Sequence, residues 1–278
     1  MQNIHTHAWD RDLHFAELLS DGEDTSPKGL FATTVHFDPF IKDMLPFDKV
    51  VVFGMKAKLV GVWVPDQFIA DFVAKDPAKL VGFVSCDPTQ EGYMEELKYG
   101  VESLHLCGVK MAPMYAGFDP RDSRCDSVYM YCQENGIPIL FHAGTTFLMK
   151  APLKFSRPIL FDEIAIKYPN LKIVLAHMGH PYCEECIVVI RKHPNLYTDI
   201  SALQGRPWQF YNAMISVQEY RVENKLLFGT DYPFMSSIET IRRFRDINEM
   251  TSGTSLPQVS VRVMDEILER NSLNLLGI

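Results

Sequence analysis

Side chains that bind metals or move protons occur where several short apolar stretches of the sequence end. They are His5, His7, Lys110, His142, His177, His180 and Asp231. Imidazole and carboxylate groups together suit Zn²⁺ and related divalent metals. His5 and His7 stand two residues apart, so on a strand they would point the same way and could hold one ion. A single histidine of this kind is more often a hydrogen-bonded structural group, so the predicted metal site rests on the joint pattern.

The apolar stretches themselves predict eight strands. The expected strands are 2–7, 49–54, 80–86, 107–112, 138–143, 172–177, 196–200 and 225–229. Several are continuous apolar runs, which suits parallel strands that are covered on both faces. Helical patterns lie between and after them, at 66–75, 91–101, 122–134, 158–168, 182–192, 208–219, 237–246 and 258–269.

This alternation of strands and helices predicts an α/β fold, a closed (β/α)₈ TIM barrel rather than a doubly wound sheet. The 278 residues suit a single barrel domain over 1–278, with a long loop at about 8–47 and a C-terminal helix. No G-x-G-x-x-G follows the first strand, which weakens a dinucleotide-binding interpretation. The active site of such a barrel lies at the C-terminal ends of the strands, where the metal-capable side chains are found.

Composition limits the partners and the compartment. The formal net charge of -8 argues against nucleic acid and anionic membranes as partners. No apolar run approaches the length that spans a bilayer, and the position of His5 leaves no room for a signal peptide before it. The six cysteines are expected to be reduced thiols, and Cys183 and Cys186 lack the second pair that a zinc ribbon needs. We therefore expect a cytoplasmic protein that acts on a small molecule.

The order of these groups resembles the amidohydrolase superfamily: a strand-one H-x-H, a histidine after each of strands five and six, and an aspartate after strand eight. The sequences of these motifs are most similar to the second branch of that superfamily, which includes aminocarboxymuconate-semialdehyde decarboxylase, resorcylate decarboxylase and several hydrolases. The stretches that carry the resemblance are 81–88, 108–111, 175–181, 227–233 and 267–277, and together they extend over nearly the whole chain.

The resemblance implies a role for each matching residue. The implied metal ligands are His5, His7, His142 and Asp231. His177 matches the catalytic histidine that holds a water on the metal, and Asp231 would also take the proton from that water. One divalent metal is expected, zinc first and manganese second, and members of this branch are often homodimers.

The roles of Lys110 and His180 remain open from the sequence. Three alternative roles are open for Lys110. It would be carboxylated and bridge two metals, or it would pair with a substrate carboxylate, or it would pair with an acidic side chain in the cleft. His180 is a candidate for substrate binding, or a cap or packing residue at the start of a helix. Asp199 is expected to be a hydrogen-bonding residue near the site, and Arg121 and Arg124 to form surface salt bridges rather than bind a carboxylate.

The expected activity is hydrolysis of a C–O or C–N bond in a small, carboxylated substrate by a metal-activated water. The alternative is a metal-dependent, non-oxidative decarboxylase of an aromatic or unsaturated carboxylic acid. The motifs do not separate the two, and hydrolysis is placed first because the superfamily is mostly hydrolytic. A second alternative is a metal-free barrel that acts as a binding protein, which would predict at least one missing ligand.

Overall fold

The computed structural model of the protein describes residues 1–16 and 33–278. Its main sheet has eight strands in the order β1-β2-β5-β6-β7-β8-β9-β10, and every paired neighbour in it is parallel. The strands are β1 (Gln2–His7), β2 (Lys49–Phe53), β5 (Leu80–Cys86), β6 (Gly108–Met111), β7 (Ile139–Phe141), β8 (Ile173–Leu175), β9 (Leu196–Asp199) and β10 (Leu226–Leu227). All eight predicted strands are therefore confirmed, and most are shorter than predicted.

The first and last strands come together and nearly close the barrel. Just beyond β10, the backbone of Ile4 donates to Phe228 at 3.0 Å, and the backbone of His7 donates to Tyr232 at 2.8 Å. Since sequence-distant strand ends meet around one axis, side chains that follow them share one rim. The TIM-barrel prediction is thus confirmed.

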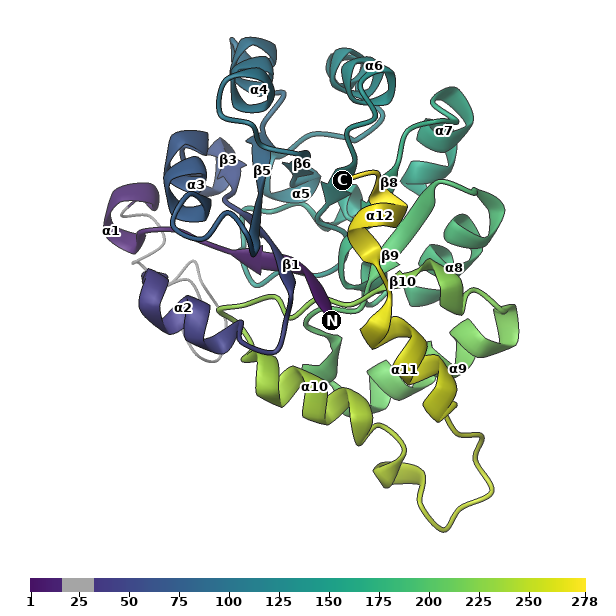
Figure 1. Ribbon diagram of the computed structural model, residues 1–278. Coiled ribbons are helices and arrows are strands. Elements are labelled where there is room, and N and C mark those ends of the chain that lie inside the picture. Colours follow the sequence, from purple (N-terminus) through teal and green to yellow (C-terminus); the bar gives the residue numbers. More distant parts are fainter. Residues whose placement is uncertain (17–32) are drawn as a thin grey trace.

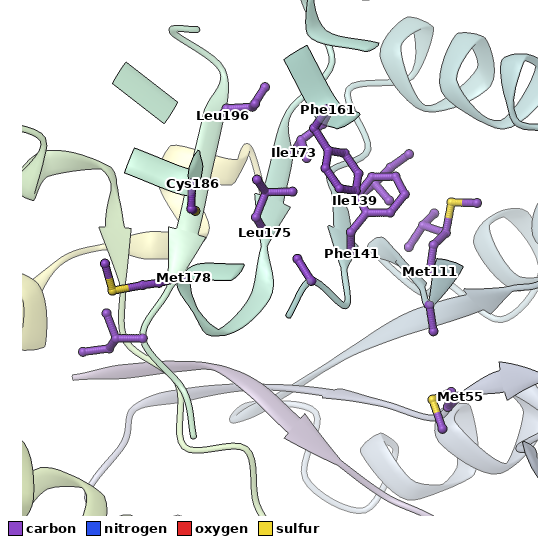
Figure 2. Close-up of a cluster of buried hydrophobic side chains, with 14 of the residues drawn as sticks. Met55, Met111, Ile139, Phe141, Phe161, Ile173, Leu175, Met178, Cys186 and Leu196 are labelled. Carbon is purple, nitrogen blue, oxygen red and sulfur yellow. The ribbon is translucent and has the colours of Figure 1, made fainter. Parts of the chain in front are cut away.

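Alternating residues of the strands face two different apolar layers. Val51, Leu140 and Val174 belong to the cluster inside the barrel. Their chain neighbours belong to the larger cluster between the strands and the helices. Figure 2 shows part of that outer layer, where Phe141 lies against Phe161 with ring centroids 4.7 Å apart. The continuous apolar runs in the sequence follow from burial on both faces.

Helices surround the strands, as Figure 1 shows. Those that match the predicted helices are α3 (Asp66–Val73), α4 (Tyr93–Glu102), α6 (Asp126–Glu134), α7 (Leu160–Lys167), α8 (Cys183–Lys192), α9 (Pro207–Tyr220), α10 (Ser237–Arg245) and α11 (Val261–Glu269). Cys183 and Cys186 both lie on α8 as free thiols. No helix in the described part of the chain has the length and apolar character needed to cross a membrane.

Several short elements were not predicted. The predicted loop at about 8–47 contains α1 (Arg11–His14) and α2 (Phe37–Asp43), while its residues 17–32 lie outside the described residues. A hairpin joins β3 (Lys56–Ala57) to β4 (Val62–Trp63), and α5 (Pro113–Ala116) follows β6. These elements are too short for a hydrophobic period to develop in the sequence.

The chain after α11 ends in a separate helix, α12 (Ser272–Leu276). The backbone of Arg270 is extended, and the side chain of Asn271 caps α12 by accepting from the Asn274 backbone at 3.2 Å. Leu273 and Leu276 of α12 join the cluster inside the barrel. The C-terminal segment therefore contributes to the barrel core.

Candidate metal centre

A bulge in β1 places both of its histidines at the rim of the barrel. The pairing with β2 moves from Asn3 opposite Val50 to Thr6 opposite Val52, so β1 contains one extra residue. Both imidazoles then pack on the ring of Phe53, with centroid distances of 5.0 Å for His5 and 4.8 Å for His7. The structure thus places His5 and His7 side by side, as their spacing predicts.

Asp231 stands over these two histidines. Its backbone has a φ of 63°, in the left-handed region, and its N–H donates to the His5 carbonyl at 2.9 Å. Its Oδ1 lies 3.2 Å from Nε2 of His5 and 3.2 Å from Nε2 of His7. Burial alone would raise the pKa of this carboxyl, but His177, His5 and His7 together hold it well below its ordinary value. Asp231 is therefore a carboxylate at neutral pH.

Asp199 and Ser201 fix the orientations of His5 and His177 by hydrogen bonds to their Nδ1 atoms. Asp199, at the end of β9, accepts from Nδ1 of His5 at 2.9 Å. Nδ1 of His177 lies 3.1 Å from the backbone carbonyl of Ser201 and 2.8 Å from its hydroxyl. That hydroxyl in turn donates to Asp199. A carbonyl and a carboxylate can only accept, so Nδ1 of each histidine carries a proton, and in the neutral form of each imidazole Nε2 keeps a free lone pair.

The convergent atoms suit a metal ion. One ligand atom from each of His5, His177 and Asp231 lies within 4.8 Å of the other two. Nε2 of His5 and Oδ1 of Asp231 are buried and, although 3.2 Å apart, have no well-aligned hydrogen bond among the described residues. Buried polar atoms are normally paired, and a set of imidazole nitrogens around one carboxylate is a donor set that divalent metals prefer. The residues present therefore fit a bound divalent metal.

His142 lies in the same cavity but in a different setting. Its ring packs beside that of His177, with centroids 5.0 Å apart, and its Nε2 lies 3.3 Å from the Thr145 carbonyl oxygen. Neither His142 nor His7 belongs to the group of three convergent ligand atoms, which come from His5, His177 and Asp231. Which of His142 and His177 completes the ligand set stays a prediction.

Most of the imidazoles at the centre are held neutral. Burial lowers the pKa of His7 to about 3 and that of His177 to about 4, and it lowers the pKa of His142 well below its ordinary value. Burial also lowers the pKa of His5, but Asp199 and Asp231 outweigh it and the pKa ends above the ordinary value. Neutral imidazole is the form that binds metals, so His7, His142 and His177 need lose no proton to become ligands.

Lys110 lies on β6 with its ammonium group inside the cavity. Its side chain is 1% exposed, and its Nζ has no hydrogen-bond partner among the described residues. The Nζ atom lies 4.5 Å from the centroid of the Phe53 ring. Burial lowers its pKa to about 8, against the opposing effect of Asp199 and Asp231. The predicted pairing with an acidic side chain is not found in the described part of the chain.

The cavity at this rim has a volume of about 400 Å³. His7, Lys110, His142, His177, His180 and Asp231 all line it. Aromatic rings form much of its wall: Trp9, Tyr115, Phe147 and Phe234. His180 does not cap α8, because that helix begins at Cys183 after Tyr182, and its predicted role in substrate binding stays a prediction. His177 and Met178 have left-handed backbones, which turns the chain so that His180 also reaches the cavity.

Sequence reasoning missed three polar residues here. Ser201, Arg206 and Arg243 have no motif around them, and nothing in the sequence tells that they approach the site. Ser201 is two residues beyond Asp199, and Arg206 and Arg243 line the cavity from the segments after β9 and β10. The expected surface salt bridges are confirmed: Arg121 pairs with Asp119 and Glu163, and Arg124 pairs with Asp122.

Comparison with known proteins gives a family and a fold. The model of the family described as amidohydrolase matches residues 3–278. A search of curated proteins finds no match. Among solved structures, an uncharacterised TIM-barrel protein from Bordetella bronchiseptica is 19% identical, with a TM-score of 0.74 and coverage of 100% of this chain and 99% of that chain.

Two similar structures have named activities. A probable 2-pyrone-4,6-dicarboxylic acid hydrolase from Acinetobacter baumannii, with citric acid bound, is 15% identical, with a TM-score of 0.70 and coverage of 100% and 99%. A 5-carboxyvanillate decarboxylase from Novosphingobium aromaticivorans, with manganese and a nitrobenzoic acid bound, is 15% identical, with a TM-score of 0.68 and coverage of 100% and 97%. At these identities the likeness establishes the fold alone.

Proposed function

Because the chain belongs to the amidohydrolase family, we propose that it is a metal-dependent enzyme that removes carbon dioxide from a planar, unsaturated or aromatic carboxylic acid. The observation that carries this proposal is the buried ammonium of Lys110, without a hydrogen-bond partner in the described structure, in a cavity walled by aromatic rings. Flat apolar walls suit a planar substrate, and a lone buried cation suits its carboxylate. Hydrolysis, placed first from the sequence, becomes the second candidate.

The metal would be held by chain groups already directed into the cavity. His5, His7 and Asp231 would hold one divalent ion, Zn²⁺ or Mn²⁺, together with His177 or His142. A divalent cation bound there supplies a Lewis acid for an oxygen atom of the substrate. The manganese in the similar decarboxylase supports the choice of a divalent ion. A second metal bridged by a carboxylated Lys110 is the less favoured arrangement.

Lys110 would both bind the leaving carboxylate and supply the proton that replaces it. With a pKa of about 8, its ammonium form dominates at neutral pH. The ammonium pairs with the substrate carboxylate, the bond from ring carbon to carboxyl carbon breaks, and carbon dioxide departs. The electron pair left on the ring carbon then takes a proton from Nζ, which recovers one from solvent. A donor with a pKa near the working pH is well matched to this step.

Hydrolysis is favoured by a different observation, the position of Asp231. Its carboxylate has a depressed pKa and an oxygen without a hydrogen-bond partner among the described residues. It would accept a proton from a water that attacks the carbonyl carbon, and return that proton to the leaving oxygen or nitrogen when the C–O or C–N bond breaks. The similar dicarboxylic acid hydrolase supports this candidate.

The two candidates leave different atoms in the product. We would incubate the metal-loaded protein with 5-carboxyvanillate and with 2-pyrone-4,6-dicarboxylate, in D₂O and separately in ¹⁸O-water. Decarboxylation predicts released carbon dioxide and deuterium on the vacated carbon, whereas hydrolysis predicts ¹⁸O in the product. The Lys110→Met variant should lose most of its decarboxylation activity. A fully loaded protein that consumes neither acid would contradict the proposed substrate class.

A further inference from the structure

Arg206 is held at the cavity wall by a fixed backbone. Its N–H donates to the Leu203 carbonyl at 2.8 Å, and its own carbonyl accepts from the backbone of Phe210 at 2.9 Å in the first turn of α9. Pro207, the next residue, restricts the conformation of Arg206 further. The base of the side chain is therefore fixed in place before any ligand arrives.

The guanidinium of Arg206 is free, whereas that of its neighbour Arg243 is occupied. Arg206 is half-buried, lines the cavity, and makes no side-chain hydrogen bond or ion pair with the described residues. Arg243 also lines the cavity, but its guanidinium donates to Glu239 and, at 3.1 Å, to the Gln204 carbonyl. Of the two arginines, only Arg206 has its planar set of donors available for a ligand.

The balance of charge in the cavity singles out the same residue. The chain has a net charge of -8, yet the cavity lining contains three cationic and two acidic side chains. Glu239 neutralises Arg243, and Lys110 and Asp231 have opposite charges near the metal centre. Burial and then the charge of Arg206 lower the pKa of His180 to about 4, so His180 is neutral. The positive charge of Arg206 is thus left without compensation.

We propose that Arg206 is a second carboxylate-binding subsite, so that the substrate is a planar dicarboxylic acid. One carboxylate would lie at Lys110 near the metal centre, and the other would lie against Arg206 on the cavity wall. A guanidinium binds a carboxylate through two parallel hydrogen bonds, which gives both affinity and orientation. Arg206 would therefore fix which carboxylate reacts. This inference rests on the proposed function, because it specifies the substrate of the same cavity.

Binding of matched acids tests the subsite. We would titrate the metal-loaded protein with benzoate, isophthalate and terephthalate by calorimetry, since these acids share one ring and differ in the second carboxylate. The better of the two dicarboxylates should bind about ten- to a hundred-fold more tightly than benzoate. Arg206→Gln should remove that difference, while Arg206→Lys should retain only part of it. Arg221→Gln, at the opposite end of α9, is the matched control.

The outcomes separate this inference from the proposed function. Any of three results would overturn the subsite, even in an active enzyme. They are equal affinity for benzoate and both dicarboxylates, no detectable binding of either dicarboxylate, and a preference for a dicarboxylate that survives in Arg206→Gln. If the protein prefers a dicarboxylate through Arg206 but neither decarboxylates nor hydrolyses any acid, the proposed function is refuted and the subsite is not. Circular dichroism of each variant checks that the fold is intact.

Discussion

Replacing Ser201 by alanine removes one hydroxyl from beneath the proposed metal centre. That hydroxyl donates to Asp199 and lies 2.8 Å from Nδ1 of His177. Asp199 keeps its other contacts, from Nδ1 of His5 at 2.9 Å and from the backbone of His177 at 3.1 Å. We therefore expect the barrel to fold while His177 loses part of the restraint that directs its Nε2 into the cavity.

The size of the effect follows from the bond that is lost. A hydrogen bond to a charged group contributes about 1.5–3 kcal/mol, and about 1.4 kcal/mol corresponds to a tenfold change in an equilibrium constant. Outer partners of metal-binding histidines commonly change metal affinity by about 10- to 100-fold. Ser201→Ala should therefore weaken metal binding by about 10- to 100-fold.

Competition with a chromophoric chelator measures this affinity for Zn²⁺ and Mn²⁺ without reference to activity. Ser272→Ala is the matched control, because Ser272 is also buried and its hydroxyl has no hydrogen-bond partner in the described structure. It lies on α12, next to the apolar cluster inside the barrel. If Ser201→Ala binds metal as tightly as the wild type while its fold is intact, the assignment of Ser201 as a positioning residue is refuted.

Three further substitutions test separate parts of the site. Asp231→Asn should abolish turnover with the fold intact, since asparagine tolerates the left-handed backbone at this position, and near-normal kcat would remove Asp231 from the chemistry. The kcat/KM for decarboxylation should fall as pH rises through about 8, where the Lys110 ammonium loses its proton, and the residual activity of Lys110→Met should lack that alkaline limb. In Gly229→Ala the added Cβ would lie 2.7 Å from Cβ of His5. We therefore expect the free energy of unfolding in urea to fall by about 1–3 kcal/mol, and metal binding to weaken. If both quantities are unchanged, the close packing of Gly229 against His5 is contradicted.

The barrel could be predicted because its strands are buried on both faces and each leaves a run of apolar residues in the sequence. The same reasoning could not find the hairpin of β3 and β4, whose strands have two residues each. It also missed the bulge in β1, because pairing with β2 decides where an extra residue is accommodated. His5 lies within the irregular stretch between Asn3 and Thr6, yet His5 and His7 still both contact Phe53, as their spacing indicated.

Site residues could be predicted only where the residue type itself indicates a chemical role. Histidine and aspartate after a strand are visible in a sequence, and the structure brings His5, His7, His177 and Asp231 together. Ser201 and Arg206 carry no such signal. Their positions depend on the turn between β9 and α9, where Ala202 has a φ of 62°. A left-handed alanine is a product of tertiary packing and cannot be read from local sequence preferences.

The central claim, a divalent metal held by the strand-end histidines and Asp231, is tested most directly by metal analysis of the purified protein. We would prepare the wild type and His5→Ala without chelators, verify their folds, and measure transition metals by inductively coupled plasma mass spectrometry before and after addition of Zn²⁺ or Mn²⁺. The account predicts one tightly bound ion per chain in the wild type and its loss in His5→Ala. A folded wild-type protein that carries no transition metal and takes up neither ion would contradict the account and favour a metal-free binding barrel.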